Sequence, residues 1–333
     1  MINNRLELYK QLEEKRKSKV LVFVTSDRPN MDAMIAPDIL PYITHHLDRM
    51  GDQEKISLYL YTRGGQTTAA WSLVNLLRSF CNELEIIVPF HCHSAGTLIC
   101  LGANNIVMTR QATLGPIDPS TNGFMNPQIQ LNNLPFKVPV SVEAVYGYLE
   151  MARKDLGITD QESLTKIYLS LSEKIHPLTL GEVFKTKSQI QMLARTLLAY
   201  QNTNVEQQNK IIRFLCSESG SHDYTIHRKE AKEVLGLNIE YPDAGLYSII
   251  NSIYLNIEHD LLLNTPYNPA QLMVNTDQYP YSYKRCLIES IDYGTNAFIS
   301  EGVLTKQLQA PGQPPAVHDS RKFEGWRYEG ILY

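Results

Sequence analysis

The sequence lacks the features that would assign the chain to a membrane or to a nucleic acid. No stretch approaches the roughly 20 consecutive apolar residues that a membrane-spanning helix needs. The N-terminus is charged and has no continuous apolar run, so it indicates no signal peptide. The chain has 31 lysine and arginine residues against 35 aspartate and glutamate residues, and its formal net charge of −4 indicates no basic surface for nucleic acid. We therefore expect no membrane segment and no nucleic-acid partner.

Cysteine is scarce as well, with five residues that show no CxxC spacing: Cys81, Cys92, Cys100, Cys216 and Cys286. An odd, dispersed set is typical of reduced thiols and favours a cytoplasmic location. His91 and His93 flank Cys92, but a strand would direct the two histidines to one side and the cysteine to the other. No second ligand cluster completes a zinc set. We expect no metal and no cofactor.

The first third of the chain alternates between buried strands and amphipathic helices. Short runs of β-branched and apolar residues are typical of strands that are buried on both faces. The order strand, helix, strand, helix, strand favours an α/β fold with a parallel sheet core and helices on its faces. The predicted strands are 19–25, 56–62, 84–89 and 106–109, and the predicted helices between them are 38–50, 66–80 and 95–103.

The composition changes along the chain and suggests three parts. We expect an N-terminal helix within residues 1–18, a main domain over 19–263 and a C-terminal extension over 264–333. Within the main domain, residues 120–140 are rich in asparagine, glutamine and proline and are interpreted as a loop or lid. Helical patterns follow at 142–156, 163–174, 186–200, 206–215 and 228–234.

Two short motifs at predicted strand ends carry the candidate chemistry. Gly64–Gly65 lies between a strand and a helix, where glycines let the backbone turn sharply and leave amides free for a substrate oxygen. Ser94 lies between a strand and a helix that begins with Ala95 and Gly96, a place that exposes its hydroxyl. Each motif alone has an ordinary explanation, a tight turn for the glycines and a helix N-cap for the serine. Their combination is more specific.

The spacing of these motifs resembles that of a known peptidase family. Tyr61-Thr-Arg-Gly-Gly, His93-Ser-Ala-Gly-Thr and Leu114-Gly-Pro-Ile-Asp-Pro occur in the order found in the Clp protease and signal peptide peptidase A clan. Together with residues 174–181, 188–195 and 221–226, they make the chain similar to the serine dehydrogenase proteinase family over roughly residues 19–240. The resemblance implies a Clp-protease or crotonase-like fold, a peptide or protein substrate and a homo-oligomer.

The resemblance also implies roles for individual residues. Ser94 would be the nucleophile, and the amides of Gly65 and Ala95 would form the oxyanion hole, with Gly64 as the first residue of the glycine pair. The residue after the serine is alanine where the family often has glycine, a change that leaves the needed amide intact.

The general base is less clear from the sequence. The Clp pattern places a histidine soon after the fourth strand, and this chain has none there. The first assignment is His176, which occupies the place of the signal-peptide-peptidase lysine, with Asp223 or His222 completing the set. Lys174 and Lys137 are alternatives for a Ser–Lys dyad. His176 could instead begin a helix, and His222–Asp223 could cap one.

Three functions fit this pattern. The first is a serine peptidase that forms an acyl-enzyme at Ser94. The second is a crotonase-like enzyme that uses the same oxyanion hole to stabilise an enolate of an acyl-coenzyme A thioester. Such an enzyme needs no serine at the start of the helix, so Ser94 counts against it. The third is a catalytically inactive scaffold of the same fold, which the missing Clp-position histidine keeps open.

Overall fold

A computed structural model describes residues 5–117, 120–121, 123–131, 134–201, 204–218, 221, 223–307 and 316–332. The chain forms two compact units, and each is described by itself. Unit 1 comprises Met1–Leu114 and Ile226–Tyr333, and unit 2 comprises Gly115–Thr225. Among the helices of the described ranges, none combines the length and the hydrophobicity needed to cross a bilayer.

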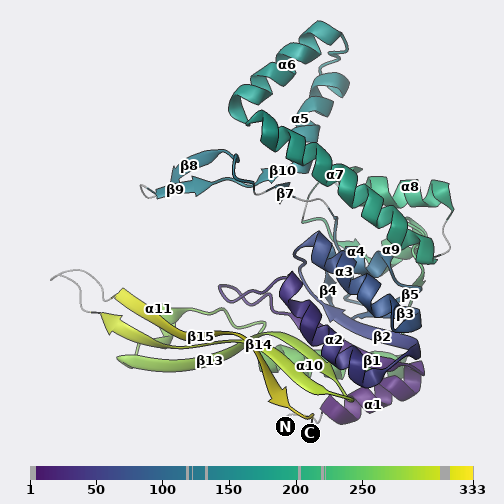
Figure 1. The fold of residues 1–333 in the computed structure, drawn as a ribbon, viewed down its shortest axis with the longest axis vertical. Coiled ribbons are helices and arrows are strands. Elements are labelled where there is room, and N and C mark those ends of the chain that lie inside the picture. Colours follow the sequence, from purple (N-terminus) through teal and green to yellow (C-terminus); the bar gives the residue numbers. More distant parts are fainter. Residues whose placement is uncertain are drawn as a thin grey trace. The chain divides into compact units, whose positions relative to one another are not determined.

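Unit 1 is built on an eight-stranded sheet with the order β12-β5-β3-β2-β1-β13-β14-β15 (Figure 1). The strands β12, β5, β3, β2 and β1 are parallel to one another, and β13, β14 and β15 continue the sheet in antiparallel fashion. The predicted parallel core of an α/β fold is therefore confirmed. The strands are β1 (Lys19–Thr25), β2 (Gln53–Tyr61), β3 (Cys81–Val88), β5 (Asn105–Met108), β12 (Ile239–Glu240), β13 (Gln278–Ser290), β14 (Gly294–Gln307) and β15 (Ala316–Gly330).

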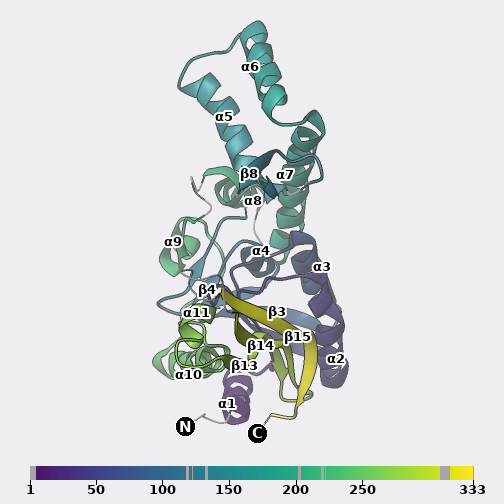
Figure 2. The same ribbon diagram turned by 90° about the vertical axis from the view of Figure 1, so that its left-hand side faces the viewer.

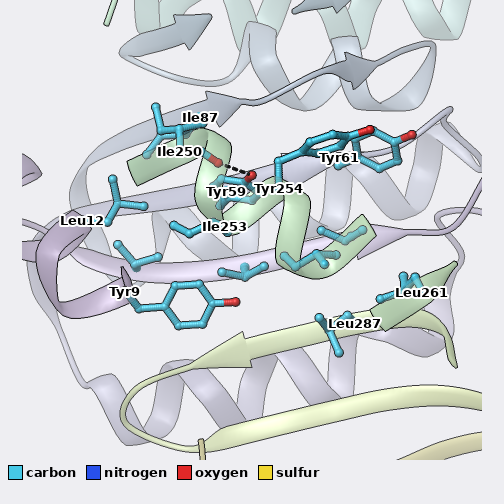
Figure 3. Close-up of a cluster of buried hydrophobic side chains, with 14 of the residues drawn as sticks. Tyr9, Leu12, Tyr59, Tyr61, Ile87, Ile250, Ile253, Tyr254, Leu261 and Leu287 are labelled. Atoms are coloured by element: carbon cyan, nitrogen blue, oxygen red, sulfur yellow. Dashed lines mark hydrogen bonds between the residues drawn. The ribbon is translucent and has the colours of Figure 1, made fainter. Parts of the chain in front are cut away.

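Both faces of the parallel core are covered by helices, as continuous apolar strands require. Alternate residues of β1, Val20, Val22 and Val24, join Tyr59 and Tyr61 of β2 in one buried cluster (Figure 3). The helices α1 (Arg5–Arg16) and α10 (Ala244–Leu261) contribute to that cluster. The helices α2 (Leu40–Met50) and α3 (Thr67–Arg78) lie on the other side of the sheet from α10 (Figure 2).

Helix α10 is the main element that the sequence analysis did not predict. Its buried residues follow helical spacing, with Leu246, Ile250, Ile253 and Ile257 on one face. Asp243 caps its N-terminus, because its Oδ1 accepts a hydrogen bond from the Leu246 N–H at 2.7 Å. Both signals are present in the sequence, so this helix was predictable.

Short elements complete unit 1 around the carboxyl ends of the parallel strands. A three-stranded sheet has the order β11-β6-β4, and α4 follows β4 after two residues, His93 and Ser94. These elements are β4 (His91–Cys92), α4 (Ala95–Leu101), β6 (Thr113–Leu114), β11 (Ile226–His227), α9 (Arg228–Glu233), α11 (Pro269–Leu272) and the 3-10 turn η1 (Pro37–Ile39).

Unit 2 is mainly helical and has its own small core. Val140, Val142, Val145, Leu180 and Val183 form a buried cluster. Its elements are β7 (Ser120–Thr121), β8 (Gln128–Leu131), β9 (Leu134–Lys137), β10 (Val140–Ser141), α5 (Val142–Lys154), α6 (Gln161–Lys174), α7 (Pro177–Leu198), η2 (Ala199–Gln201), α8 (Val205–Arg213) and η3 (Phe214–Glu218).

The segment 120–140, interpreted from the sequence as a loop or lid, contains short strands. β8 pairs antiparallel with β9, and β7 pairs with β10. The residues of β8 are all exposed. The alternation of glutamine with isoleucine and leucine in β8 therefore does not correspond to a buried and an exposed face.

The structure divides the chain differently from the three parts expected from the sequence. Residues 264–333 do not form a separate extension, because β13 pairs with β1 and extends the central sheet, with Val22 opposite Glu289. Unit 2 instead lies in the middle of the expected main domain. The short apolar runs of residues 286–288 and 297–299 belong to the long strands β13 and β14, whose outer parts are more polar and more exposed. Strands β13 and β14 of this C-terminal segment are thus part of the core of unit 1.

Truncation of the chain after Leu263 should therefore unfold unit 1. It removes β13 from the edge of β1 and takes Leu287, Ala297 and Ile299 out of the main buried cluster. Burial of one large apolar side chain contributes about 1.5–3 kcal/mol, and a domain has only roughly 5–15 kcal/mol of net stability. Circular dichroism should show no cooperative thermal transition, and Leu287→Ala should lower the melting temperature of the full chain. A truncated protein that melts like the full chain would show that the C-terminal strands are dispensable.

Candidate active site

Ser94 occupies a strained turn between β4 and α4. Its backbone has φ 51° and ψ −115°, a conformation that residues other than glycine rarely adopt. Strain of this kind costs about 1–3 kcal/mol and clusters at active sites, and a strand-to-helix turn is where several hydrolases expose a nucleophilic serine. The Ser94 side chain makes no hydrogen bond to the N-terminus of α4, so the N-cap explanation is not supported.

The glycine pair lies directly against this turn. Gly64 and Gly65 have φ angles of 116° and 146°. A Cβ atom on Gly64 would lie 2.7 Å from the Ser94 Cβ and 3.2 Å from the Ala95 nitrogen. A Cβ atom on Gly65 would lie 2.3 Å from the Ile35 carbonyl oxygen. Both the backbone conformation and the lack of space therefore require glycine, and the fold brings together two motifs that are about 30 residues apart.

Hydrogen bonds on the far side of each peptide group fix the directions of two amides. Ile35 N–H donates to the Gly64 carbonyl oxygen at 2.8 Å. The peptide bonds are trans, so the Gly65 N–H points away from Ile35. The Ser94 carbonyl oxygen accepts from Leu98 N–H at 3.1 Å, so the Ala95 N–H points out of the start of α4. Within the described residues of unit 1, neither amide has a hydrogen-bond acceptor.

Thr62 links the glycine turn to the strand that leads to Ser94. Its buried Oγ1 accepts hydrogen bonds from Gly64 N–H at 3.0 Å and from Thr25 Oγ1 at 2.7 Å. Its backbone N–H donates to His91 O at 3.0 Å, and its carbonyl oxygen accepts from His93 N–H at 3.0 Å. Thr62 thereby sets the spacing of the two motifs. The sequence analysis did not single it out, although a polar residue directly before a glycine pair at the end of a buried strand is a usable signal.

The space around the start of α4 explains why small residues follow Ser94. A Cβ atom on Gly96 would lie 2.5 Å from the Thr62 Cγ2 and 2.9 Å from the Cys92 Sγ. Thr97 Oγ1 donates to the Cys92 carbonyl oxygen at 3.0 Å. The start of α4 is thus packed directly onto the preceding strand, which keeps Ser94 in its turn.

The histidines around Cys92 lie on one side, as the sequence analysis predicted. The rings of His91 and His93 have centroids 5.0 Å apart, and Cys92 is buried with its Sγ 3.5 Å from the Cys100 Sγ. His93 Nε2 lies 2.9 Å from Thr113 Oγ1, and His91 Nδ1 lies 3.4 Å from the same oxygen. Burial lowers the pKa of His91 and raises that of the Cys92 thiol.

The candidates for the general base belong to unit 2. His176 is exposed and caps α7, because its Nδ1 accepts a hydrogen bond from Leu178 N–H at 3.2 Å. This is the alternative role that the sequence analysis considered for it. Lys174 lies in the last turn of α6. Lys137 ends β9, and its Nζ lies 4.1 Å from the centre of the Phe124 ring.

Of the remaining predicted residues, the structure describes Asp223. Asp223 N–H donates to Ser221 Oγ at 3.2 Å within a turn ahead of β11. His222 lies outside the described residues, as does Asp118 of the predicted Leu114-Gly-Pro-Ile-Asp-Pro turn. The described contacts therefore bring Ser94, Gly64, Gly65 and Ala95 together within unit 1, and the base remains a prediction.

A serine on a strained strand-to-helix turn beside two amides without an acceptor is an arrangement typical of serine hydrolases. Residues 1–142 match the family of ClpP-like SDH-type serine proteinases. This match covers the glycine pair, Ser94 and Ala95, and it confirms the resemblance inferred from the sequence. The chain is thus related to a serine proteinase family through the part that carries the candidate nucleophile.

Curated relatives and solved structures extend the comparison. Two uncharacterized proteins of Methanocaldococcus jannaschii are 27% identical over 244 residues (71% of this chain and 73% of the relative) and 23% identical over 246 residues (72% of each). A mutant of the 1510-N membrane-bound stomatin-specific protease is 14% identical, covering 68% of this chain and 83% of its own, with a TM-score of 0.39. A ClpP1 mutant from Listeria monocytogenes is 12% identical, covering 71% and 99%, with a TM-score of 0.37. At these TM-scores nothing further follows from the solved structures.

Gly65→Ala should displace the glycine turn, whereas Gly51→Ala should not. Both glycines have positive φ, but a Cβ atom on Gly51 would meet nothing within 4 Å. Gly51→Ala should therefore cost only backbone strain, about 1–3 kcal/mol. Gly65→Ala adds a clash with the Ile35 backbone, and overpacking typically costs a further 1–3 kcal/mol or so. Thermal unfolding should show a larger loss for Gly65→Ala. Equal losses in the two variants would mean that the contact with Ile35 does not constrain the turn.

Proposed function

We propose that this chain is a serine peptidase with Ser94 as nucleophile and the amides of Gly65 and Ala95 as its oxyanion hole. The observation that carries the proposal is the strained backbone of Ser94 beside two amides that have no acceptor in unit 1. Ser94 carries its hydroxyl on the strained turn between β4 and α4, and the two N–H groups are fixed by hydrogen bonds on the opposite side of their peptide planes. The serine proteinase family match over residues 1–142 supports the same reaction class.

The chemistry that this arrangement supports is acyl transfer. The Ser94 Oγ attacks the carbonyl carbon of a peptide bond while a base takes the hydroxyl proton. Negative charge develops on the carbonyl oxygen and is stabilised by the two amides. The tetrahedral intermediate expels the amine, which receives the proton, and an ester to Ser94 remains. Water then attacks that ester in the same way, which releases the carboxylic acid and restores Ser94.

The alternatives from the sequence make different demands on the site. An enolate-stabilising enzyme needs the two amides but no hydroxyl at the tip of the turn. An inactive scaffold needs neither, and the strain at Ser94 would then have no function to maintain it. The backbone of Ser94 therefore favours the peptidase over both alternatives.

We propose His176 as the base, oriented by Asp223 or His222, with Lys137 or Lys174 as the alternative in a Ser–Lys dyad. In the described conformation, Nδ1 of His176 accepts a hydrogen bond from Leu178 N–H. A neutral imidazole with Nδ1 as acceptor carries its proton on Nε2 and cannot take another proton there. His176 can act as base through Nδ1 only after this capping bond breaks, and through Nε2 only after the proton has also moved to Nδ1. A deprotonated lysine needs no such change.

The substrate and the assembly are inferred from the family resemblance, and the location from the cysteines. The resemblance supports a peptide or protein substrate and a homo-oligomer. All five cysteines are buried and outside any disulfide, which fits a reducing compartment such as the cytoplasm. Each of these is a proposal that rests on the reaction class.

Ser94→Ala should abolish labelling by a fluorophosphonate probe and hydrolysis of peptides. Gel-based labelling and a peptide turnover assay measure the two effects, and thermal unfolding serves as the control for folding. Ser79→Ala is a matched variant, because Ser79 is exposed at the end of α3, and it should label like the wild type. Wild-type turnover in a folded Ser94→Ala protein would refute the peptidase proposal.

The order of activities in a set of base variants identifies the base. If His176 acts as base, His176→Ala should lose nearly all turnover, while Lys137→Ala and Lys174→Ala retain most of it. His222→Ala and Asp223→Asn should lose less than His176→Ala if they only orient the base. If Lys137→Ala or Lys174→Ala is inactive while His176→Ala retains turnover, the base is that lysine and the site is a Ser–Lys dyad. If His222→Ala is the only inactive variant of the set, the base is His222.

A further inference from the structure

A cavity of unit 1 lies beside the glycine turn. It has a volume of about 420 Å³ and is lined by residues that follow three parallel strands: Asp27 after β1, Arg63 after β2, and Phe90 and His91 after β3. The C-terminal end of α10 closes it with Glu258 and the residues beyond Leu261. The carboxyl ends of parallel strands are the usual place for ligands in α/β proteins. The cavity is also within the size range of small-molecule sites.

One wall of this cavity is aromatic. The rings of Phe90 and Tyr254 are stacked, with centroids 5.6 Å apart and an angle of 10° between their planes. Tyr61 lies 5.8 Å from Tyr254 and 5.8 Å from His91, so the four rings are in a continuous series. Figure 3 shows Tyr61 and Tyr254 together at one end of the buried cluster. The faces of such rings attract cations, and the attraction increases when the cation loses water.

The charged groups of the cavity leave one carboxylate without a cation. Asp27 is paired with Arg63, whose Nε lies 3.0 Å from its Oδ2 and whose side chain is 65% exposed. Glu258 accepts hydrogen bonds from the Tyr254 hydroxyl and from Asn264 Nδ2. Within the described part of the chain, no lysine or arginine forms an ion pair with Glu258. The cavity therefore carries one unpaired negative charge.

Two further features favour a positive ligand. The 18-residue helix α10 ends at Leu261, and the partial negative charge at a helix C-terminus attracts cations. Burial lowers the pKa of His91 and so disfavours an opposing positive charge on its ring. Aromatic faces, an unpaired carboxylate and a helix C-terminus thus act in the same direction.

We propose that this cavity binds an organic cation, a primary ammonium or guanidinium group on a short apolar chain. Glu258 pairs with the charged group, and Phe90, Tyr254 and Tyr61 contact the chain. The cation belongs either to a free small amine or to a lysine or arginine side chain of a peptide. The proposal is independent of the peptidase reaction, because it concerns binding alone.

Isothermal titration tests this with the Ser94→Ala protein, in which a peptide probe would not be consumed. The probes are butylamine, the peptide acetyl-Ala-Lys-Ala-amide, and acetyl-Ala-Norleucine-Ala-amide as the uncharged match of the lysine peptide. We expect saturable binding of a cationic probe and none of the norleucine peptide. Binding of butylamine alone identifies the ligand as a free amine, whereas tighter binding of the lysine peptide identifies it as a peptide side chain. Equal binding of the lysine and norleucine peptides, or no binding of either cation, overturns the proposal.

Two substitutions locate the binding. Glu258→Gln keeps the shape of the side chain and removes its charge, and it should weaken binding of the cation roughly tenfold or more, as loss of a charged hydrogen bond does. Glu14→Gln makes the same change at an exposed position of α1 that does not line the cavity, and it should bind like the parent. Phe90→Leu should weaken binding through loss of the aromatic face. Unchanged binding in a folded Glu258→Gln protein places the cation elsewhere and refutes the proposal.

Discussion

The candidate active site depends on one steric constraint, the absence of any Cβ atom at residues 64 and 65. This short segment passes between the Ile35 backbone on one side and the Ser94 turn on the other. The Ile35 N–H fixes the Gly64 carbonyl and so directs the Gly65 amide away from it. Thr62 holds the same segment to the strand before Ser94. Any side chain on the glycines would separate the two amides that the proposed reaction needs close together.

The sheet provides the rigid frame for this contact. The glycine turn and the serine turn follow the neighbouring strands β2 and β3, whose pairing is continuous from Gln53 opposite Cys81 to Tyr59 opposite Ile87. Helices cover both faces of these strands, and β13 protects the outer edge of β1. Because the strands are buried on both sides, the strain at Ser94 is supported by a large core. The strands β13 and β14 add to this core, which gives a physical reason for them to belong to the same unit as the site.

Much of the parallel core and of the glycine and serine turns was predictable from the sequence, because buried parallel strands are continuous apolar runs. The division of the chain was not, since the pairing of β1 with a strand about 260 residues later leaves no local signal. Helix α10 was missed although its capping aspartate and apolar spacing are both visible. Strand β8 was missed because it lies in a segment rich in asparagine, glutamine and proline, and all four of its residues are exposed. The hydrogen bonds of the Thr62 hydroxyl depend on the turn that the glycines create, so the sequence alone does not predict them.

The base could not be assigned from the sequence for a similar reason. Residue types such as histidine and lysine occur several times in unit 2, and their role depends on hydrogen bonds that spacing does not encode. The capping bond of His176 is an example, because it uses the nitrogen that a triad histidine reserves for its carboxylate partner. The oxyanion hole is different, since backbone amides are placed by the turn and not by side-chain identity.

A crystal structure of the protein with a peptidyl phosphonate bound tests the central claim most directly. The phosphorus should be bonded to Ser94 Oγ, and the phosphonyl oxygen should lie about 2.7–3.1 Å from both the Gly65 and the Ala95 nitrogens, as an oxyanion hole requires. An adduct on another residue, or a phosphonyl oxygen that contacts neither amide, would contradict the account.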